Sequence, residues 1–293
     1  MMKMHERIVA PLWLEAGNML GESPRWDAAH HRWIWVDIAA GKVFVREAPS
    51  GEIREWAPGR QVSLALPEDR DHLIIAHHGG ISRLSLLHGN TTLLTDMGLR
   101  WNDLRCNDGA ADAQGRLWIG TTAFDHRAGG GDLYVIGKSR RAEVRYPAVA
   151  CSNGITWSPD GKTMYYTDSL ARTIVAFDSA ENGTLANERV IITIPPAYGL
   201  PDGMACDAEG MLWIALWGGF GVGRYDPATG EQINFIEIPV PNATACCFGG
   251  PRLDTLLITT AAKETNLAQY PLSGSLYAVQ PGVSGIPTGR IDL

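Results

Sequence analysis

Short apolar runs flanked by turn residues recur at regular intervals along this chain of 293 residues. Six of them share one pattern, and they occupy residues 32–37, 72–77, 116–121, 163–168, 211–216 and 255–260. The central residues of these runs are Trp35, Ile75, Ile119, Tyr166, Ile214 and Ile258. Successive central residues are about 40 to 48 positions apart, which is the period of a four-stranded propeller blade.

The segments around each run complete the same unit. A hairpin turn rich in Asp and Gly precedes several runs, as in DAQG (112–115), SPDG (158–161) and DAEG (207–210). A third strand follows at 132–136, 173–178 and 275–279. Long helical periodicity and interdomain linkers are absent from the sequence. The pattern predicts one all-β domain over residues 1–293, a six-bladed β-propeller of four-stranded antiparallel blades. Residues 8–14 are expected to supply the outer strand of the last blade, and the even spacing disfavours a β-sandwich.

Composition narrows the functional classes. With 45% hydrophobic and 19% charged residues the chain can form a large core, and its net charge of −7 argues against nucleic-acid or membrane partners. No run approaches the roughly 18 apolar residues of a membrane span, and residues 1–6 lack the apolar region of a signal peptide. We therefore expect a cytoplasmic protein. The five cysteines form no C-x-x-C motif and are expected to be buried thiols, with a Cys246–Cys247 disulfide as the alternative.

The phase of the repeat predicts which side chains face the propeller axis. Positions 12 or 13 residues before each central residue fall where the innermost strand of a blade begins. They are Glu22, Val62, Asn107, Asn153, Asp202 and Ala245. Turn preferences explain single Asn and Asp residues there, but they explain neither Glu22 nor the shared phase. We interpret the four polar positions as a site of converging oxygen atoms. Such a site suits Ca²⁺, Mg²⁺ or Mn²⁺, while Zn²⁺ and Fe²⁺ are disfavoured but not excluded.

Further candidates flank this site. Arg105 lies two residues before Asn107 on the same side of an extended segment, so it is expected to point inward, although a surface ion pair is an alternative. Loops after the second strands should form the rim of the pocket. They offer Asp37, His78, Asp125, His126, Asp168, Trp217 and Lys263. Among the paired histidines, only His78 is placed to touch a substrate. Phosphate-binding loops, G-x-S-x-G elbows and Cys/His dyads are absent from the sequence.

The motifs at these positions resemble those of the senescence marker protein/gluconolactonase/luciferin-regenerating enzyme family. They are GESPRW (21–26), RCNDGAADAQGRLWIGT (105–121), SNGITWSPDGK (152–162) and PDGMACDAEGMLWIA (201–215). The segments ALWGGFG (215–221) and LAQYPLSG (267–274) are similar to bacterial xylono- and arabinonolactonases.

The resemblance implies one divalent metal ion held by Glu22, Asn153 and Asp202, with Arg105 and Asn107 on the substrate side. Asp125 stands where regucalcin-like members carry a substrate-contacting Glu, one methylene longer.

The activity that this resemblance implies is metal-dependent hydrolysis of a pentono- or hexonolactone to the sugar acid. Asp202 is the expected general base, and hydroxide on the metal is the alternative. The aldonolactone, its ring size and the native metal stay open. One alternative function is that of a non-catalytic metal-binding or interaction propeller. A second alternative is an arylesterase or organophosphate hydrolase, although those enzymes usually have apolar pockets. We expect a monomer, because a closed propeller leaves no free sheet edges.

Overall fold

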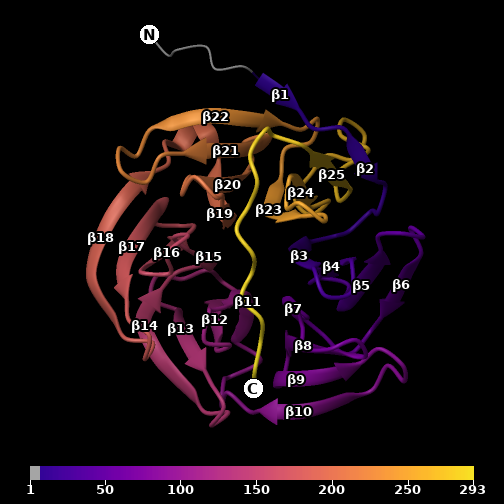
Figure 1. Ribbon diagram of the computed structural model, residues 1–293, viewed down its shortest axis with the longest axis vertical. Helices are drawn as coiled ribbons and strands as arrows, with labels where there is room; N and C mark the ends of the chain where they lie inside the picture. The colour runs from indigo at the N-terminus through magenta and orange to yellow at the C-terminus, as the bar shows by residue number, and fades with distance from the viewer. Residues whose placement is uncertain (1–6) are drawn as a thin grey trace.

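The computed structural model describes residues 7–293, which form six sheets around a central axis (Figure 1). Blades 1 and 2 contain β3 (Gly21–Asp27), β4 (Arg32–Asp37), β5 (Lys42–Glu47), β6 (Ile53–Trp56), then β7 (Leu64–Pro67), β8 (His72–His77), β9 (Gly80–Ser85), β10 (Thr91–Thr95). Blades 3 and 4 contain β11 (Leu104–Ala111), β12 (Leu117–Ala123), β13 (Gly131–Ile136), β14 (Ala142–Val149), then β15 (Ser152–Trp157), β16 (Thr163–Asp168), β17 (Thr173–Ser179), β18 (Leu185–Thr193). Blades 5 and 6 contain β19 (Leu200–Cys206), β20 (Leu212–Trp217), β21 (Gly221–Tyr225), β22 (Gln232–Glu237), then β23 (Ala243–Gly249), β24 (Thr255–Thr260), β25 (Leu276–Val279). The predicted six-bladed all-β propeller is confirmed.

The ring is closed by the N-terminal segment. Strand β2 (Leu12–Leu14) pairs antiparallel with β25 and becomes the outer strand of blade 6, as predicted. Strand β1 (Arg7–Val9) instead lies parallel to β22 and extends blade 5 to five strands, so the predicted place of residues 8 and 9 in the last blade is wrong. Within residues 7–293 the helical content is a single 3-10 turn, η1 (Pro196–Tyr198). None of the described helices is long and apolar enough to span a membrane.

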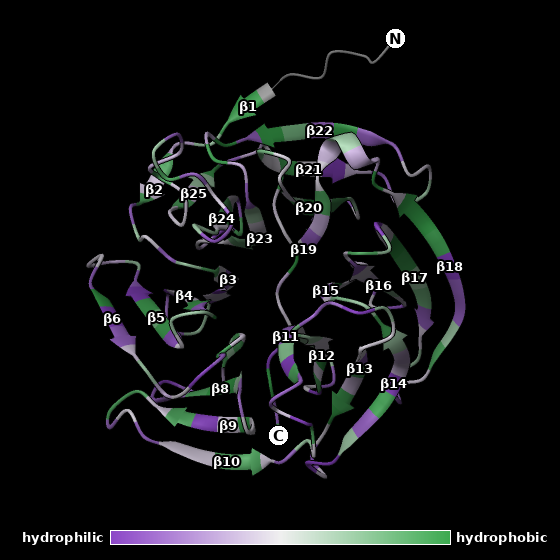
Figure 2. Cartoon of the chain, turned by 180° about the vertical axis from the view of Figure 1, so that it is seen from behind, coloured by the Kyte–Doolittle hydropathy of each residue, from purple (hydrophilic) through white to green (hydrophobic). Residues whose placement is uncertain are grey.

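Packing between blades follows from the repeat. The six central residues of the repeated runs lie on the second strands and are at most 1% exposed. Apolar residues gather mainly on the strands, and hydrophilic ones are frequent in the connecting loops (Figure 2). The Asp of two hairpin turns has a second role, because Asp112 Oδ2 accepts a hydrogen bond from Trp118 Nε1 at 2.8 Å and Asp207 Oδ2 accepts one from Trp213 Nε1 at 2.9 Å. The motif therefore satisfies a buried indole N–H as well as forming the turn.

Residues 280–293, called here the C-terminal strap, cross the axis on the face that carries these hairpin turns (Figure 1). The strap is bound to three blades, since Gly285 bridges to Asp207 in blade 5, Asp292 N donates to Gly115 O in blade 3 and Arg290 Nη2 donates to Glu68 O in blade 2.

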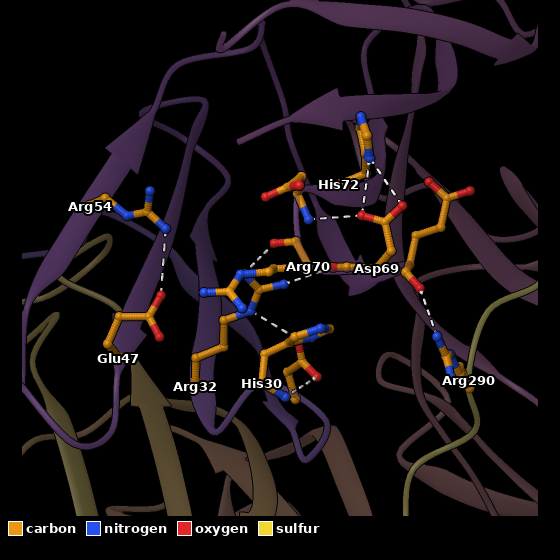
Figure 3. Close-up of polar contacts among 11 residues, drawn as sticks. His30, Arg32, Glu47, Arg54, Asp69, Arg70, His72 and Arg290 are labelled. Atoms are coloured by element: carbon orange, nitrogen blue, oxygen red, sulfur yellow. Dashed lines mark hydrogen bonds and ion pairs between the residues drawn. The ribbon is translucent and has the colours of Figure 1, made fainter. Parts of the chain in front are cut away.

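Arg32 connects blades 1 and 2 on this same face. Its guanidinium donates from Nη1 to Arg70 O and from Nη2 to Asp69 O, at 2.8 and 2.9 Å (Figure 3). The inner strands begin at the opposite face of the propeller, where the predicted site lies.

All five cysteines fall within the described residues and are buried, unpaired thiols. This confirms the expectation for them, including the adjacent Cys246 and Cys247.

Candidate functional site

One-residue bulges direct the predicted site residues toward the axis. The inner strands β3, β11, β15, β19 and β23 each have one extra residue relative to the neighbouring strand. The shifts lie between Glu22 and Arg25, Cys106 and Gly109, Asn153 and Ile155, Pro201 and Met204, and Ala243 and Ala245. A bulge bends the strand and re-aims a side chain that would otherwise alternate with the pleat. The common position of these residues within the sequence repeat therefore corresponds to a bulge at the same place in five of the six inner strands.

Three buried carboxylates share the axial region. Glu22 is 6% exposed, Asp108 is 6% and Asp202 is 7%. Burial, followed by repulsion from Asp108, raises the pKa of Glu22 from 4.5 to about 8. Burial, then repulsion from Glu22 and Asp108, raises the pKa of Asp202 well above its usual value. Carboxylates in this environment are unfavourable as anions unless positive charge accompanies them.

Two arginines supply part of that positive charge. Arg25 on β3 lies 3.6 Å from Asp108 Oδ1 and donates from Nη1 to Pro24 O at 2.8 Å. Arg105 on β11 lowers the pKa of both Glu22 and Asp202 by electrostatic attraction. When all five groups are ionised, three carboxylates and two guanidinium groups leave one net negative charge. A bound divalent cation would make the net charge of the cluster positive.

A chain of hydrogen bonds connects the two axial asparagines. Asn107 Nδ2 donates to Ser152 O at 2.7 Å and to Asn153 Oδ1 at 2.9 Å. Asn153 Nδ2 donates to Ser169 Oγ at 2.8 Å. The structure therefore brings Asn107 and Asn153 together, as the sequence predicted. Both N–H groups of the Asn107 amide are engaged, and its oxygen already accepts a hydrogen bond from Arg105. A ligand can therefore bind this amide through the remaining lone pair of the oxygen.

Arg105 points inward, as expected. Its Nη1 donates to Asn107 Oδ1 and, at 3.0 Å, to Cys106 O. Within residues 7–293 neither Nε nor Nη2 of Arg105 has a protein hydrogen-bond partner, so three N–H donors are available. A guanidinium with free donors beside buried carboxylates can bind an oxygen-rich molecule.

The residues predicted as metal ligands fit a hard cation. Asp202 Oδ1 is buried and is without a hydrogen-bond partner among the described residues. Among the described residues, Glu22 Oε2 accepts only the N–H of Ser23, at 3.0 Å. In the part of the chain that the structure describes, no three His, Cys, Asp or Glu side chains are grouped as metal ligands. A carboxamide oxygen would have to complete the set, and Asn153 Oδ1 is suited to do so. An orphaned carboxylate oxygen with carboxylate and amide neighbours matches the preferences of Ca²⁺ or Mg²⁺.

The remaining axial positions, Val62 and Ala245, are buried and contribute no ligand.

Four of the candidate rim residues, Asp37, Asp168, His78 and Asp125, have side-chain contacts within the protein. The carboxylate of Asp37 accepts the amides of Met19, Leu20 and Ala40, and that of Asp168 accepts those of Ala150, Cys151 and Leu170. These two side chains hold the loops before the inner strands, so their carboxylates are engaged by backbone amides. The His78 ring lies 5.5 Å from the Trp101 ring. The Asp125 carboxylate is 62% exposed and is paired with Arg127 at 2.8 Å.

The sequence reasoning missed Asp108 and Arg25. Asp108 directly follows Asn107, and in a regular strand adjacent side chains point to opposite faces. The bulge removes that alternation, so both residues reach the channel. The N-D-G turn signal was the available clue. Arg25 lies inside the bulged GESPRW segment, and no feature of the sequence distinguishes it from a surface arginine.

A cavity of about 550 Å³ lies on the other face, under the C-terminal strap. Its lining includes Arg25, Met204, Phe248 and Ile286. It does not include Glu22, Asn153 or Asp202, so the predicted metal ligands lie outside this cavity. The axial cluster is the candidate functional site because its buried charges and its unpartnered carboxylate oxygen require a ligand.

Fold and site together define a six-bladed propeller with an axial oxygen-donor site. Residues 20–262 match the model of the SMP-30/gluconolactonase/LRE-like region, and this chain belongs to that family. The sequence is 34% identical to regucalcin of Gallus gallus over 282 residues, 92% of this chain and 93% of that protein. It is 32% identical over 281 residues to YvrE of Bacillus subtilis, whose name assigns it provisionally to the sugar lactone lactonases; 94% of this chain and 96% of that protein are covered.

Among solved structures, the chain is similar to a calcium-binding protein, regucalcin, of Agrobacterium tumefaciens. The TM-score is 0.93 and the identity 26%, with each chain fully covered.

Proposed function

We propose that this protein is a metal-dependent lactonase that hydrolyses a pentono- or hexonolactone to the sugar acid. The observation that carries the proposal is the axial cluster, in which the orphaned Asp202 Oδ1 belongs to a buried carboxylate that interacts electrostatically with Glu22, Asp108 and Arg105. The family to which the chain belongs and the name of the B. subtilis relative support lactone hydrolysis.

Glu22, Asn153 and Asp202 would hold the cation, and a bound divalent cation supplies Lewis-acid polarisation of the lactone carbonyl. Asp202 accepts the proton of the attacking water through the carboxylate oxygen that the cation leaves free. Arg105 donates to the ring hydroxyls or the carbonyl of the substrate and fixes the geometry of attack. Asn107 orients Arg105 and Asn153 through one hydrogen bond with each, and a third to Ser152 O holds its own amide.

We propose Ca²⁺ as the first metal to test, because the ligands are all oxygen and the A. tumefaciens relative is described as calcium-binding. A closed ring of sheets supports a monomer, and five unpaired thiols support a reducing compartment such as the cytoplasm.

The test is a pH-indicator assay of chelator-stripped protein against a panel of 1,4- and 1,5-aldonolactones, with Ca²⁺, Mg²⁺, Mn²⁺, Zn²⁺ and Fe²⁺ restored in turn. We expect acid release on at least one lactone, lost on chelation and recovered with metal. Phenyl acetate and a phosphotriester serve as control substrates. Hydrolysis of these alone would favour an arylesterase or organophosphate hydrolase. Silence on every substrate, in folded and metal-loaded protein, would refute the lactonase and leave a binding propeller.

A further inference from the structure

His126 and Asp125 are exposed neighbours in the loop after β12, and their side chains have different partners. His126 has a left-handed backbone, with φ of 53°, and its N–H donates to Ala123 O at 3.0 Å. Histidine is among the few residues that adopt this conformation readily. The reversal sends consecutive side chains in different directions. Asp125 pairs with Arg127, and the His126 ring folds back to place Nδ1 3.4 Å from Thr122 Oγ1.

Thr122 places the ring next to the predicted substrate donor. Thr122 on β12 is the direct partner of Arg105 in the β11–β12 ladder. A ring in contact with Thr122 is therefore one strand away from Arg105. The electrostatic neighbours of His126 agree with this position, since they are Arg105 on β11, Lys263 and Glu264 in the loop after β24, and Asp125 in its own loop.

The loop that carries His126 is anchored. Arg127 forms a bidentate ion pair with Asp103, with Nη1 to Oδ1 at 2.9 Å and Nη2 to Oδ2 at 2.7 Å. Phe124 N donates to Asp103 O at 3.0 Å. Paired arginine contacts of this kind add geometric specificity. The residues on both sides of His126 are thus tied to Asp103.

The hydrogen bonds of Thr122 define the tautomer of His126. The Thr122 hydroxyl lies 3.1 Å from Ala150 O and 3.4 Å from Ala123 O, and both are carbonyl oxygens that can only accept. The single hydroxyl proton is donated to one of them, so Thr122 Oγ1 acts as an acceptor toward the ring. His126 Nδ1 therefore carries the hydrogen, and Nε2 presents a lone pair.

The surrounding charges keep the ring neutral. Burial, then the positive charges of Arg105 and Lys263, lower the pKa of His126 below 6.5, and the opposing effects of Glu264 and Asp125 are smaller. Near pH 7 the ring is uncharged, and Nε2 remains an acceptor.

We propose that His126 is a specificity-determining residue, whose Nε2 accepts a hydrogen bond from a hydroxyl of the polyhydroxylated lactone while Arg105 donates to the same molecule. This inference rests on the proposed lactonase function. A donor and an acceptor side by side distinguish a polyol ring from an unsubstituted lactone, because a missing hydroxyl leaves Nε2 unpaired.

The test compares two substitutions and a control. His126→Asn tolerates the left-handed backbone but cannot reach the position of Nε2. His126→Gln places an amide oxygen near that position. His72→Asn is the matched control, because His72 lies on the opposite face and pairs with Asp69 (Figure 3). Kinetics are measured on the hydrolysed aldonolactone and on its monodeoxy analogues, and thermal unfolding verifies folding.

We expect His126→Asn to lower kcat/KM about 10-fold on the parent lactone, mainly through KM, and to have little effect on one monodeoxy analogue. His126→Gln should recover part of the loss. The wild-type KM should rise at acid pH as His126 becomes protonated, and the Gln variant should lack this rise. His72→Asn should match the wild type.

A second readout does not need turnover. In ¹⁵N spectra of the imidazoles at pH 7.5, the signal missing from His126→Gln should be that of an Nδ1–H tautomer. An Nε2–H tautomer would overturn the inference. So would an equal loss for His126→Asn on the parent and on every monodeoxy analogue, in a wild type that is an active lactonase. A wild type that hydrolyses no lactone refutes the proposed function itself, and the inference with it.

Discussion

Replacing Glu22 by Gln removes one buried charge and almost none of the side-chain volume. We expect the metal-free variant to be more stable than the metal-free wild type at pH 9 and equally stable at pH 4.5. We also expect it to bind divalent cations more weakly. The physical reason is that Glu22 is 6% exposed and is repelled by Asp108, so its anion is costly without a cation.

The magnitude follows from the raised pKa of Glu22, which is about 8 in the folded protein against 4.5 ordinarily. Because the native state holds this proton more tightly than the unfolded state, its stabilising contribution is complete below pH 4.5 and is lost as pH rises through 8. At about 1.4 kcal/mol per pKa unit, the loss has an upper limit of about 5 kcal/mol. An unfolding entropy of about 0.6 kcal/mol/K for 293 residues converts this to at most about 8 °C in Tm.

The assay is thermal unfolding in chelator at several pH values between 4.5 and 9, followed by a Ca²⁺ titration at pH 8. Ligand at 100 times its Kd should stabilise the wild type by about 2.7 kcal/mol. The variant should need a much higher Ca²⁺ concentration for the same shift. Glu181→Gln, at an exposed position, is the control for loss of one surface charge.

Two results would refute the reasoning. A Tm difference between Glu22→Gln and the wild type that stays constant across this pH range would show that Glu22 does not titrate in the folded protein as its burial implies. An unchanged Ca²⁺ dissociation constant would exclude Glu22 as a ligand.

Three further predictions concern the base, the substrate donor and the strap. Asp202→Asn should lower kcat by about 10²- to 10⁴-fold with the fold retained by circular dichroism, and a wild-type kcat would disprove its role as base. Arg105→Ala should lower kcat/KM about 10- to 100-fold, whereas the control Arg100→Ala, at a side chain that is 78% exposed, should leave it unchanged; unaltered saturation kinetics would count against Arg105. Ile291→Ala should cost about 2 to 4 kcal/mol in thermal unfolding, because Ile291 is 4% exposed, while kcat/KM stays constant; a loss of activity at full stability would contradict a purely structural strap.

Much of the fold was present in the sequence because a propeller repeats a local unit. Each blade's hairpins depend on turns and alternating apolar residues within about 45 positions, so periodicity alone predicts them. The same regularity placed Glu22, Asn107, Asn153 and Asp202 at one level, and in the structure they lie on bulged inner strands at that level. Their roles as ligands and base remain predictions.

Contacts between distant segments decided the rest. The pairing of β1 with β22 joins residues more than 200 positions apart, and nothing in a three-residue strand specifies its partner. Asp108 reaches the channel only because a bulge interrupts the alternation of β11. Asp125 and His126 are equally polar, exposed neighbours, yet Asp125 pairs with Arg127 while the His126 ring contacts Thr122, the cross-strand partner of Arg105. The sequence by itself thus determined the repeat and the chemistry available at the axis. The tertiary structure determined which groups converge, because bulges, loop anchors and burial act between blades.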